Sequence, residues 1–253
     1  MGDVSKSKLK YERQVFSSTH SGDFKVVEYV NAHKVVVEFL FTGEKVIAQM
    51  RDILEGRVKD RMYPSVYGVG ITGEKIPVAE GKRCKQRELW VRMLDRCYSE
   101  KYRLKSPSYV GCTVSDSFKY FPHFKDWCSN QIGFDVKGFA LDKDILVKGN
   151  KLYSEETCCF VPQELNNLLT YKKATNNGLP ISVSEKKSGK FGVSFRKNSV
   201  TQNLGVFDTV EEAFYTYKQA KEDYIKVVAN RWRDQIDPRV YDALMSYTVE
   251  ITE

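Results

Sequence analysis

The sequence predicts a modular α+β protein, in which small antiparallel sheets alternate with amphipathic helices. Short β-rich runs separated by polar turns occupy residues 20–75 and recur at 181–207, whereas apolar residues elsewhere follow a helical period. The length of 253 residues exceeds one small domain, and a hydrophobic content of 42% is sufficient for packed cores. We therefore expect several modules. These are a flexible basic arm (1–20), a small β-rich module (21–80), a module with a ββα unit (81–172), and a three-stranded sheet plus helix with a helical tail (173–253).

The β-rich module begins with a hairpin signal. Residues 24–30 and 34–41 are β-rich and flank the polar turn Asn31-Ala32-His33, and a shorter run follows at 45–50. The aromatic and glycine-rich stretch 64–70 predicts a strand end or a backbone held close to another part of the molecule.

The middle module begins with a helix over 86–100, because apolar residues from Leu89 to Tyr98 recur at helical spacing. A short strand over 109–114 and an aromatic helix over 118–128, which starts or kinks near Pro122, are expected next. A hairpin-like pair (140–145 and 151–160) and a helix over 163–169 complete this module.

The last module has the plainest pattern. Strands are predicted at 181–184, 191–196 and 203–207. Thr209 and Glu212 then form a capping box, and an amphipathic helix follows that packs on one sheet face. In the second strand, alternation turns Val193 and Phe195 inward and Arg196 outward. The segment 237–253 is a further helix-like piece.

Positive charge is concentrated in two stretches, although the net charge of the whole chain is only +7. Residues 82–105 hold nine Lys or Arg against three acidic residues, and residues 172–202 hold seven against one. Such clusters neutralise several phosphates together, so they favour a polyanion as partner. The alternative interpretation is a solvated charged face.

Several other classes are disfavoured. The longest apolar stretch, 35–41, is far shorter than the roughly 20 residues of a membrane helix, and the residues after Met1 lack an apolar signal-peptide core. We therefore expect a cytoplasmic protein. The six cysteines contain no Cys-x2-4-Cys pair, so they are interpreted as buried free thiols rather than a zinc site. No phosphate-binding glycine loop or Rossmann fingerprint is found.

Residues 86–170 resemble the HNH homing endonuclease-like proteins of bacteriophages. The resemblance rests on Leu89–Tyr98, Tyr109–Val114, Leu141–Leu146, Gly149–Ser154 and Thr157–Pro162 with Asn166-Asn167. It implies that Asp142 and Asn166 ligate a divalent ion such as Mg²⁺ and that Lys143 occupies the position of the general-base histidine. A lysine is a cation at neutral pH, so it cannot accept a proton from water as imidazole does. Either the fold is kept as a DNA-binding platform without hydrolysis, which we favour, or a variant site cleaves with another base.

Residues 178–232 resemble the ethylene-response-factor (AP2-like) type of DNA-binding domain. The matching residues are Gly178–Ser184, Gly189–Phe191 and Leu204–Ala213, with Tyr217 and Ala220. The resemblance implies that the front face of the sheet lies in the major groove, so Arg196 is the candidate for a guanine contact. Candidates for phosphate contacts are Lys186, Lys187, Lys190 and Lys197 here and Arg87, Arg92 and Arg96 in the middle module.

The sequence thus predicts a double-stranded DNA-binding protein with a degenerate nuclease centre. The alternatives are an active Mg²⁺-dependent HNH endonuclease and a phage factor whose protein partner is a host complex. The oligomeric state is left open.

Overall fold

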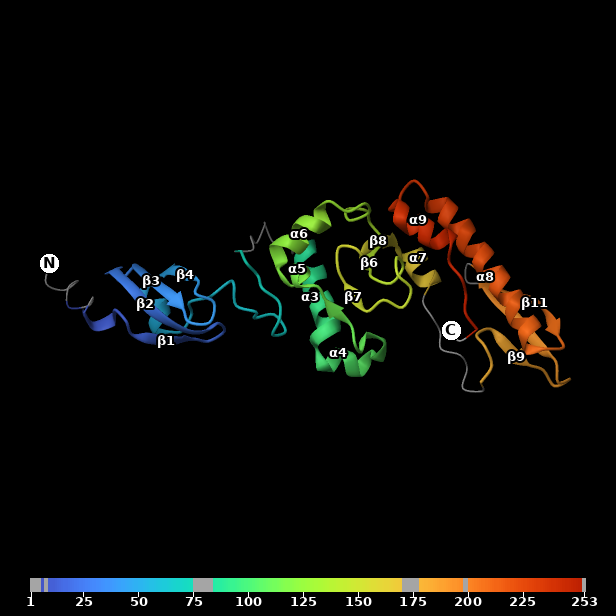
Figure 1. The fold of residues 1–253 in the computed structure, drawn as a ribbon, viewed down its shortest axis with the longest axis horizontal. Coiled ribbons are helices and arrows are strands. Elements are labelled where there is room, and N and C mark those ends of the chain that lie inside the picture. Colours follow the sequence, from blue (N-terminus) through green and yellow to red (C-terminus); the bar gives the residue numbers. More distant parts are fainter. Residues whose placement is uncertain (1–5, 7–8, 75–83, 170–177, 198–199, 252–253) are drawn as a thin grey trace. The chain divides into compact units, whose positions relative to one another are not determined.

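The computed structural model describes residue 6 and residues 9–74, 84–169, 178–197 and 200–251 (Figure 1). The chain divides into two compact units, one comprising 1–128 with 152–154, the other 129–151 with 155–253. The module boundaries expected near residues 80 and 172 lie outside the described residues. The α+β class is confirmed. The chain contains an N-terminal four-stranded sheet, small central sheets with helices, and a three-stranded sheet that packs on a long helix.

The first unit begins with an antiparallel sheet in sequential order: β1 (Val15–Ser18), β2 (Gly22–Asn31), β3 (Lys34–Phe39) and β4 (Lys45–Ala48). The predicted hairpin is confirmed, with Asn31 opposite Lys34. Strand β1 falls within the segment expected to be a flexible arm. It is held there because it pairs with β2 over its full length and because Phe16 stacks on Phe24, with ring centroids 6.1 Å apart. Residues 1–5 and 7–8 of the expected arm lie outside the described residues.

One face of this sheet forms a small core. Phe24, Val35, Val37 and Phe39 are fully buried, and α2 (Met50–Leu54) contributes Met50 and Ile53. Alternation of buried and exposed residues along β3 produces this face, as expected for a half-buried strand.

The rest of the first unit is mainly helical. It contains α3 (Lys85–Tyr98), α4 (Glu100–Lys105), the 3-10 turn η1 (Pro107–Tyr109), α5 (Asp116–Lys119) and α6 (Phe121–Ser129), and strand β5 (Thr113–Val114) pairs in parallel with β7 (Leu152–Tyr153). Trp90 is fully buried, and its Nε1 donates a 2.7 Å hydrogen bond to the Phe118 carbonyl. The glycine-rich stretch does lie close to another part of the molecule. A Cβ on Gly70 would be 2.5 Å from Leu94 Cδ1 and 3.0 Å from the Trp90 ring.

In the second unit, β6 (Phe139–Asp142) pairs antiparallel with β8 (Cys159–Pro162), and α7 (Gln163–Leu168) follows directly. The order strand, strand, helix is the expected one. The expected hairpin across residues 148–150 is not formed in that way, because Leu152 and Tyr153 pair with β5 in the first unit instead. Of the second predicted strand, only Cys159 and Phe160 therefore pair with β6, and the pairing continues beyond the prediction to Pro162.

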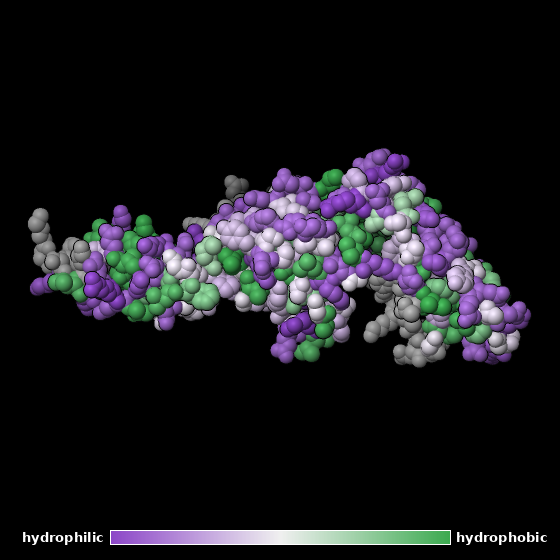
Figure 2. All heavy atoms as spheres, in the orientation of Figure 1, coloured by the Kyte–Doolittle hydropathy of each residue, from purple (hydrophilic) through white to green (hydrophobic). Residues whose placement is uncertain are grey.

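The C-terminal sheet has the order β11-β10-β9, formed by β9 (Val183–Glu185), β10 (Phe191–Lys197) and β11 (Val200–Phe207). Helix α8 (Val210–Trp232) covers one face, and α9 (Pro238–Met245) packs on α8. As predicted, Thr209 caps α8, since its Oγ1 accepts from the Glu212 N–H at 3.2 Å. Hydrophilic side chains follow the side of α8 turned to the viewer in Figure 2.

The core under this sheet is larger than the expected C-terminal module. It combines Val193 and Phe195 with residues of α8 and also with Val161 and Leu165 of the β8–α7 segment. The strand pair, α7 and the three-stranded sheet are thus parts of one folded unit. Within the described residues, no helix combines the length and apolarity needed to cross a membrane.

Candidate nucleic-acid interface

The C-terminal sheet has one covered face and one open face. Val193 and Phe195 are buried under α8, where the Phe195 ring lies 5.5 Å from that of Tyr224. Their neighbours Ser194 and Arg196 are exposed, because successive strand residues point to opposite faces. The cross-strand partners Thr201, Asn203 and Val206 lie on the same open face. Among the described strand residues on this face, none is acidic.

Lys186 reaches onto this face from the turn between β9 and β10. A side chain at Gly192 would collide with the aliphatic part of Lys186, so the lysine stem lies across the glycine. The turn itself is closed by hydrogen bonds from Lys186 N to Lys190 O and from Gly189 N to Lys186 O. Lys186, Lys187 and Arg196 have no ion-pair partner within the described part of the chain.

The other two candidates of this module are placed differently. Lys190 pairs with Asp208 at 2.7 Å, but both side chains are more than half exposed, so the pair stabilises the fold little and a phosphate can compete for the lysine. Lys197 lies on the helix side, since its Nζ is 5.1 Å from the Tyr224 ring centroid. The open face therefore carries Lys186 near the start of β10, next to the turn lysines, and Arg196 near the other end of the same strand, whereas Lys197 lies on the opposite face.

The three arginines of α3 do not form one exposed row. Arg92 is exposed, with Glu88 3.9 Å away. Arg96 is largely buried, hydrogen-bonds with Tyr153 and Tyr102, and lies over the ring of Tyr109 at 5.5 Å. Arg87 is half-buried and lines a pocket. Arg96 was a candidate for a phosphate contact, but Tyr153 of β7 and Tyr109 of the 107–109 turn cover it.

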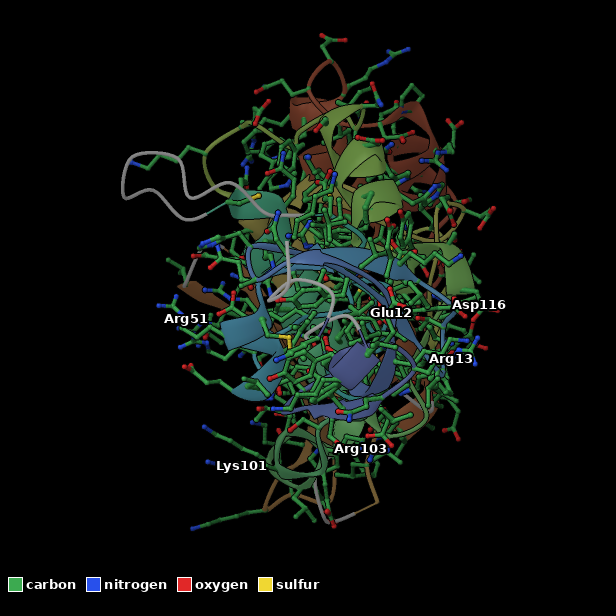
Figure 3. The ribbon with its side chains drawn as sticks, turned by 90° about the vertical axis from the view of Figure 1, so that its left-hand side faces the viewer. Glu12, Arg13, Arg51, Lys101, Arg103 and Asp116 are labelled. Carbon is green, nitrogen blue, oxygen red and sulfur yellow. The ribbon has the colours of Figure 1, made fainter. Side chains whose placement is uncertain are left out.

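Other cations of this basic stretch remain exposed. Lys101 and Lys105 are exposed on α4, and Figure 3 labels Lys101 together with Arg103 on that helix. Lys82 and Arg83, which begin the stretch, lie outside the described residues.

The Asp142–Lys143 segment forms a tightly bonded loop after β6. Asp142 Oδ1 accepts the backbone N–H groups of Asp144 (2.9 Å) and Ile145 (2.8 Å). Burial, with the nearby charge of Asp144, raises the pKa of the Asp142 carboxyl to about 6, although these two hydrogen bonds act in the opposite direction. The carboxylate thus holds the backbone turn in shape.

Lys143 is buried in the same loop, with only 7% of its surface exposed. Its Nζ donates to Asp144 Oδ2 (3.1 Å) and to the carbonyl of Asn150 (2.9 Å). In return, Asn150 Nδ2 donates to the Lys143 carbonyl at 2.7 Å. The side chain at the general-base position is therefore a buried ammonium that closes the loop 143–150.

These residues do not fit a Mg²⁺ site of the implied kind. Mg²⁺ prefers an octahedral set of oxygens, whereas here one oxygen of the Asp142 carboxylate accepts two backbone N–H groups, and the neighbouring Asp144 carboxylate pairs with Lys143. Asn166 lies on α7 and is partly exposed. Across the described ranges, no three His, Cys, Asp or Glu side chains gather as they would around a metal ion.

The cysteines are free thiols, as expected, and five of the six are buried. Burial raises the pKa of Cys159, which lies opposite Asp142 in the strand pair, so this thiol is held neutral.

The structure also reveals residues that were not candidates before. Thr201 and Asn203 join the open face, although β11 has a register shift opposite Val193 and Ser194 that disturbs simple alternation. The turn-forming Asn203 and Gly205 are the sequence signal for that irregularity, because Asn203 Oδ1 accepts from Gly205 N.

Comparison with known proteins gives no further assignment. No protein-family model, no curated protein and no solved structure matches this chain.

Proposed function

We propose that this protein binds double-stranded DNA through the open face of its C-terminal sheet. The observation that carries the proposal is the composition of that face. Arg196 and Lys186 project on it without carboxylate partners among the described residues, beside a turn with two further lysines. A polyanion is the partner that such a surface stabilises best, because each cation can replace a condensed counterion.

The shape of the face supports duplex DNA as that polyanion. A small sheet backed by a helix presents a rigid surface, and a major groove about 12 Å wide admits a two-stranded β-ribbon. Arg196 lies in the middle strand, where its guanidinium can bind a guanine edge with two hydrogen bonds. Lys186, Lys187 and Lys190 lie at the end of the sheet, where their ammonium groups contact the DNA phosphates.

The central strand pair and α7 act as a platform for this sheet rather than as a nuclease centre. This part of the proposal rests on the loop chemistry, in which Asp142 caps the backbone and Lys143 closes the loop. A base is needed to activate water for hydrolysis, and a lysine engaged with a carboxylate is protonated. The resemblance to HNH proteins is consistent with a retained scaffold.

The proposal is tested by measuring the affinity for a short duplex as a function of salt concentration. Four phosphate contacts would give a slope of log K against log salt of about −3 to −4. An affinity that does not change with salt would contradict the proposal. The host protein complex would then be the better candidate partner.

A further inference from the structure

A pocket in the first unit is lined by basic side chains that the sheet interface does not use. Its volume is about 550 Å³, and His20, Lys59, Arg61 and Arg87 contribute to its walls. These residues come from the β1–β2 turn, from the segment after α2 and from the first turn of α3. These three segments are far apart in sequence, so only the folded chain brings them together.

Hydrogen bonds fix the walls of this pocket. Asp60 N donates to Ser21 Oγ at 3.1 Å, and Gly73 N donates to the Arg61 carbonyl at 2.9 Å. Ile71 in turn exchanges backbone hydrogen bonds with Lys119 and Phe121, at the α5–α6 segment. The lining segments are therefore tied both to the N-terminal sheet and to the helices.

The two acidic residues of the lining are already engaged. Asp60 is buried, and its carboxylate accepts from Thr42 Oγ1 (2.5 Å) and from Met62 N (2.8 Å). Glu74 pairs with Lys125 at 2.7 Å. Neither carboxylate neutralises Lys59, Arg61 or Arg87, which make no ion pair or side-chain hydrogen bond within the described ranges.

Arg87 supplies the most specific observation. Its Nε is buried from solvent, yet it has no hydrogen-bond acceptor among the described residues. A buried N–H donor without an acceptor loses its hydrogen bonds to water without replacement, so native structures nearly always supply an acceptor. Within the described ranges, Arg87 Nε lacks an acceptor and two further cations of the pocket lack ion-pair partners, and this combination points to an anionic ligand.

We infer that this pocket binds a phosphoryl group, with Arg87 as its main donor and Lys59 and Arg61 as flanking cations. Three cations from two segments of the chain line this pocket, and together they match a tetrahedral anion with several oxygens, whereas a planar carboxylate is saturated by one arginine fork. The phosphoryl group belongs either to a free phosphorylated molecule or to the DNA backbone. The inference does not depend on the sheet interface.

Titration of the full-length, arginine-¹⁵N-labelled protein with inorganic phosphate, at ionic strength matched with chloride, tests the site. The Nε–Hε resonance of Arg87, assigned by its loss in Arg87→Gln, is expected to shift with phosphate. Arg51 on α2 is the matched control, because it is exposed, does not line the pocket and is not a candidate phosphate contact. An unmoved Arg87 resonance, or equal shifts of both arginines, would overturn the inference.

A second pair of variants does not depend on the half-buried arginine. Lys59→Gln with Arg61→Gln changes only exposed side chains, and it should weaken phosphate binding about tenfold or more, as loss of two charge-assisted contacts predicts. Unchanged phosphate affinity in this double variant would also overturn the inference.

The source of the phosphoryl group is decided with a short DNA duplex. If the backbone supplies it, Arg87→Gln should reduce the salt slope of duplex binding by about 1, while Arg51→Gln, at an exposed arginine that is not a candidate contact, does not. If duplex binding is unchanged although phosphate binds, the ligand is a free phosphorylated molecule. Arg196→Ala in the same assay reports on the sheet interface separately, so failure of one proposal is distinguishable from failure of the other.

Discussion

Lys143 and Asn150 hold each other through two reciprocal hydrogen bonds between side chain and backbone. Lys143 Nζ donates to the Asn150 carbonyl, and Asn150 Nδ2 donates to the Lys143 carbonyl. The pair closes the loop that follows β6, and Asp144 neutralises the buried ammonium. The residue at the expected general-base position is thus an integral part of the fold.

Removal of this closure should destabilise the second unit. Lys143→Met keeps the aliphatic stem but leaves the Asn150 carbonyl without its donor, so we expect a loss of about 1–3 kcal/mol in the free energy of unfolding. Urea denaturation followed by circular dichroism measures it. Lys137→Met is the control, because Lys137 is exposed, and it should change stability by less than about 0.5 kcal/mol.

The reciprocal geometry adds a stricter criterion. Lys143→Met and Asn150→Ala disrupt the same pair, so their combined effect should be smaller than the sum of the two single effects. Strict additivity would show that the two residues stabilise the protein independently.

The neighbours Arg196 and Lys197 offer a test of which sheet face contacts DNA. Arg196 lies on the open face, whereas Lys197 stacks on Tyr224 on the helix side. Arg196→Ala should weaken binding to a specific duplex by about 1–3 kcal/mol, and Lys197→Ala should weaken it much less. Fluorescence anisotropy with a labelled duplex measures both. Equal losses would place the contact at the strand end rather than on the open face.

The Asp142 loop predicts the result of a cleavage assay. Because Asp142 caps the backbone and Lys143 is an engaged cation, we expect no nicking of supercoiled plasmid with Mg²⁺ or Mn²⁺. Asp142→Asn is the matched variant, since its amide oxygen can still accept both N–H groups. Nicking by the natural sequence that disappears in Asp142→Asn would establish an active nuclease.

Glu222 predicts a pH-dependent attachment of the C-terminal segment. Its Oε1 accepts from Lys218 Nζ (2.6 Å) and from Val249 N (2.8 Å), and Lys218 Nζ also donates to the Val249 carbonyl (2.7 Å). Burial raises the pKa of Glu222, but the hydrogen bonds from Lys218 and Val249 outweigh it, so the pKa is lowered overall.

A lowered pKa means that this stabilisation is present above the ordinary glutamate pKa and is lost as the pH falls through the folded value. Glu222→Gln should therefore reduce stability by about 1 kcal/mol at pH 7, and by less at pH 3. Thermal unfolding at both pH values measures this difference. Asp223→Asn, on the exposed side of α8, is the control. A difference that grows toward low pH would refute the assigned sign.

Local patterns in the sequence determined those elements in which the contacting residues are near one another in sequence. The β2–β3 hairpin, α3, the Thr209 cap and the inward turn of Val193 and Phe195 follow from periodicity and turn chemistry, which act over a few residues. The open face with Arg196 follows from the same alternation. Strand β1 was not recognised, because it is a run of only four residues within the basic segment 1–20 and forms a strand by pairing with β2.

Only the tertiary structure decided which polar groups meet. It buried Arg96 among tyrosines, separated Lys197 from Arg196, and turned Lys143 into a loop closure. It also assembled Arg87 with Lys59 and Arg61 around one pocket. Such encounters depend on the packing of segments distant in sequence, and side-chain type and spacing carry no information about that packing. The sequence alone thus determined the fold class and the basic sheet, whereas long-range packing decided the chemistry of each charged side chain.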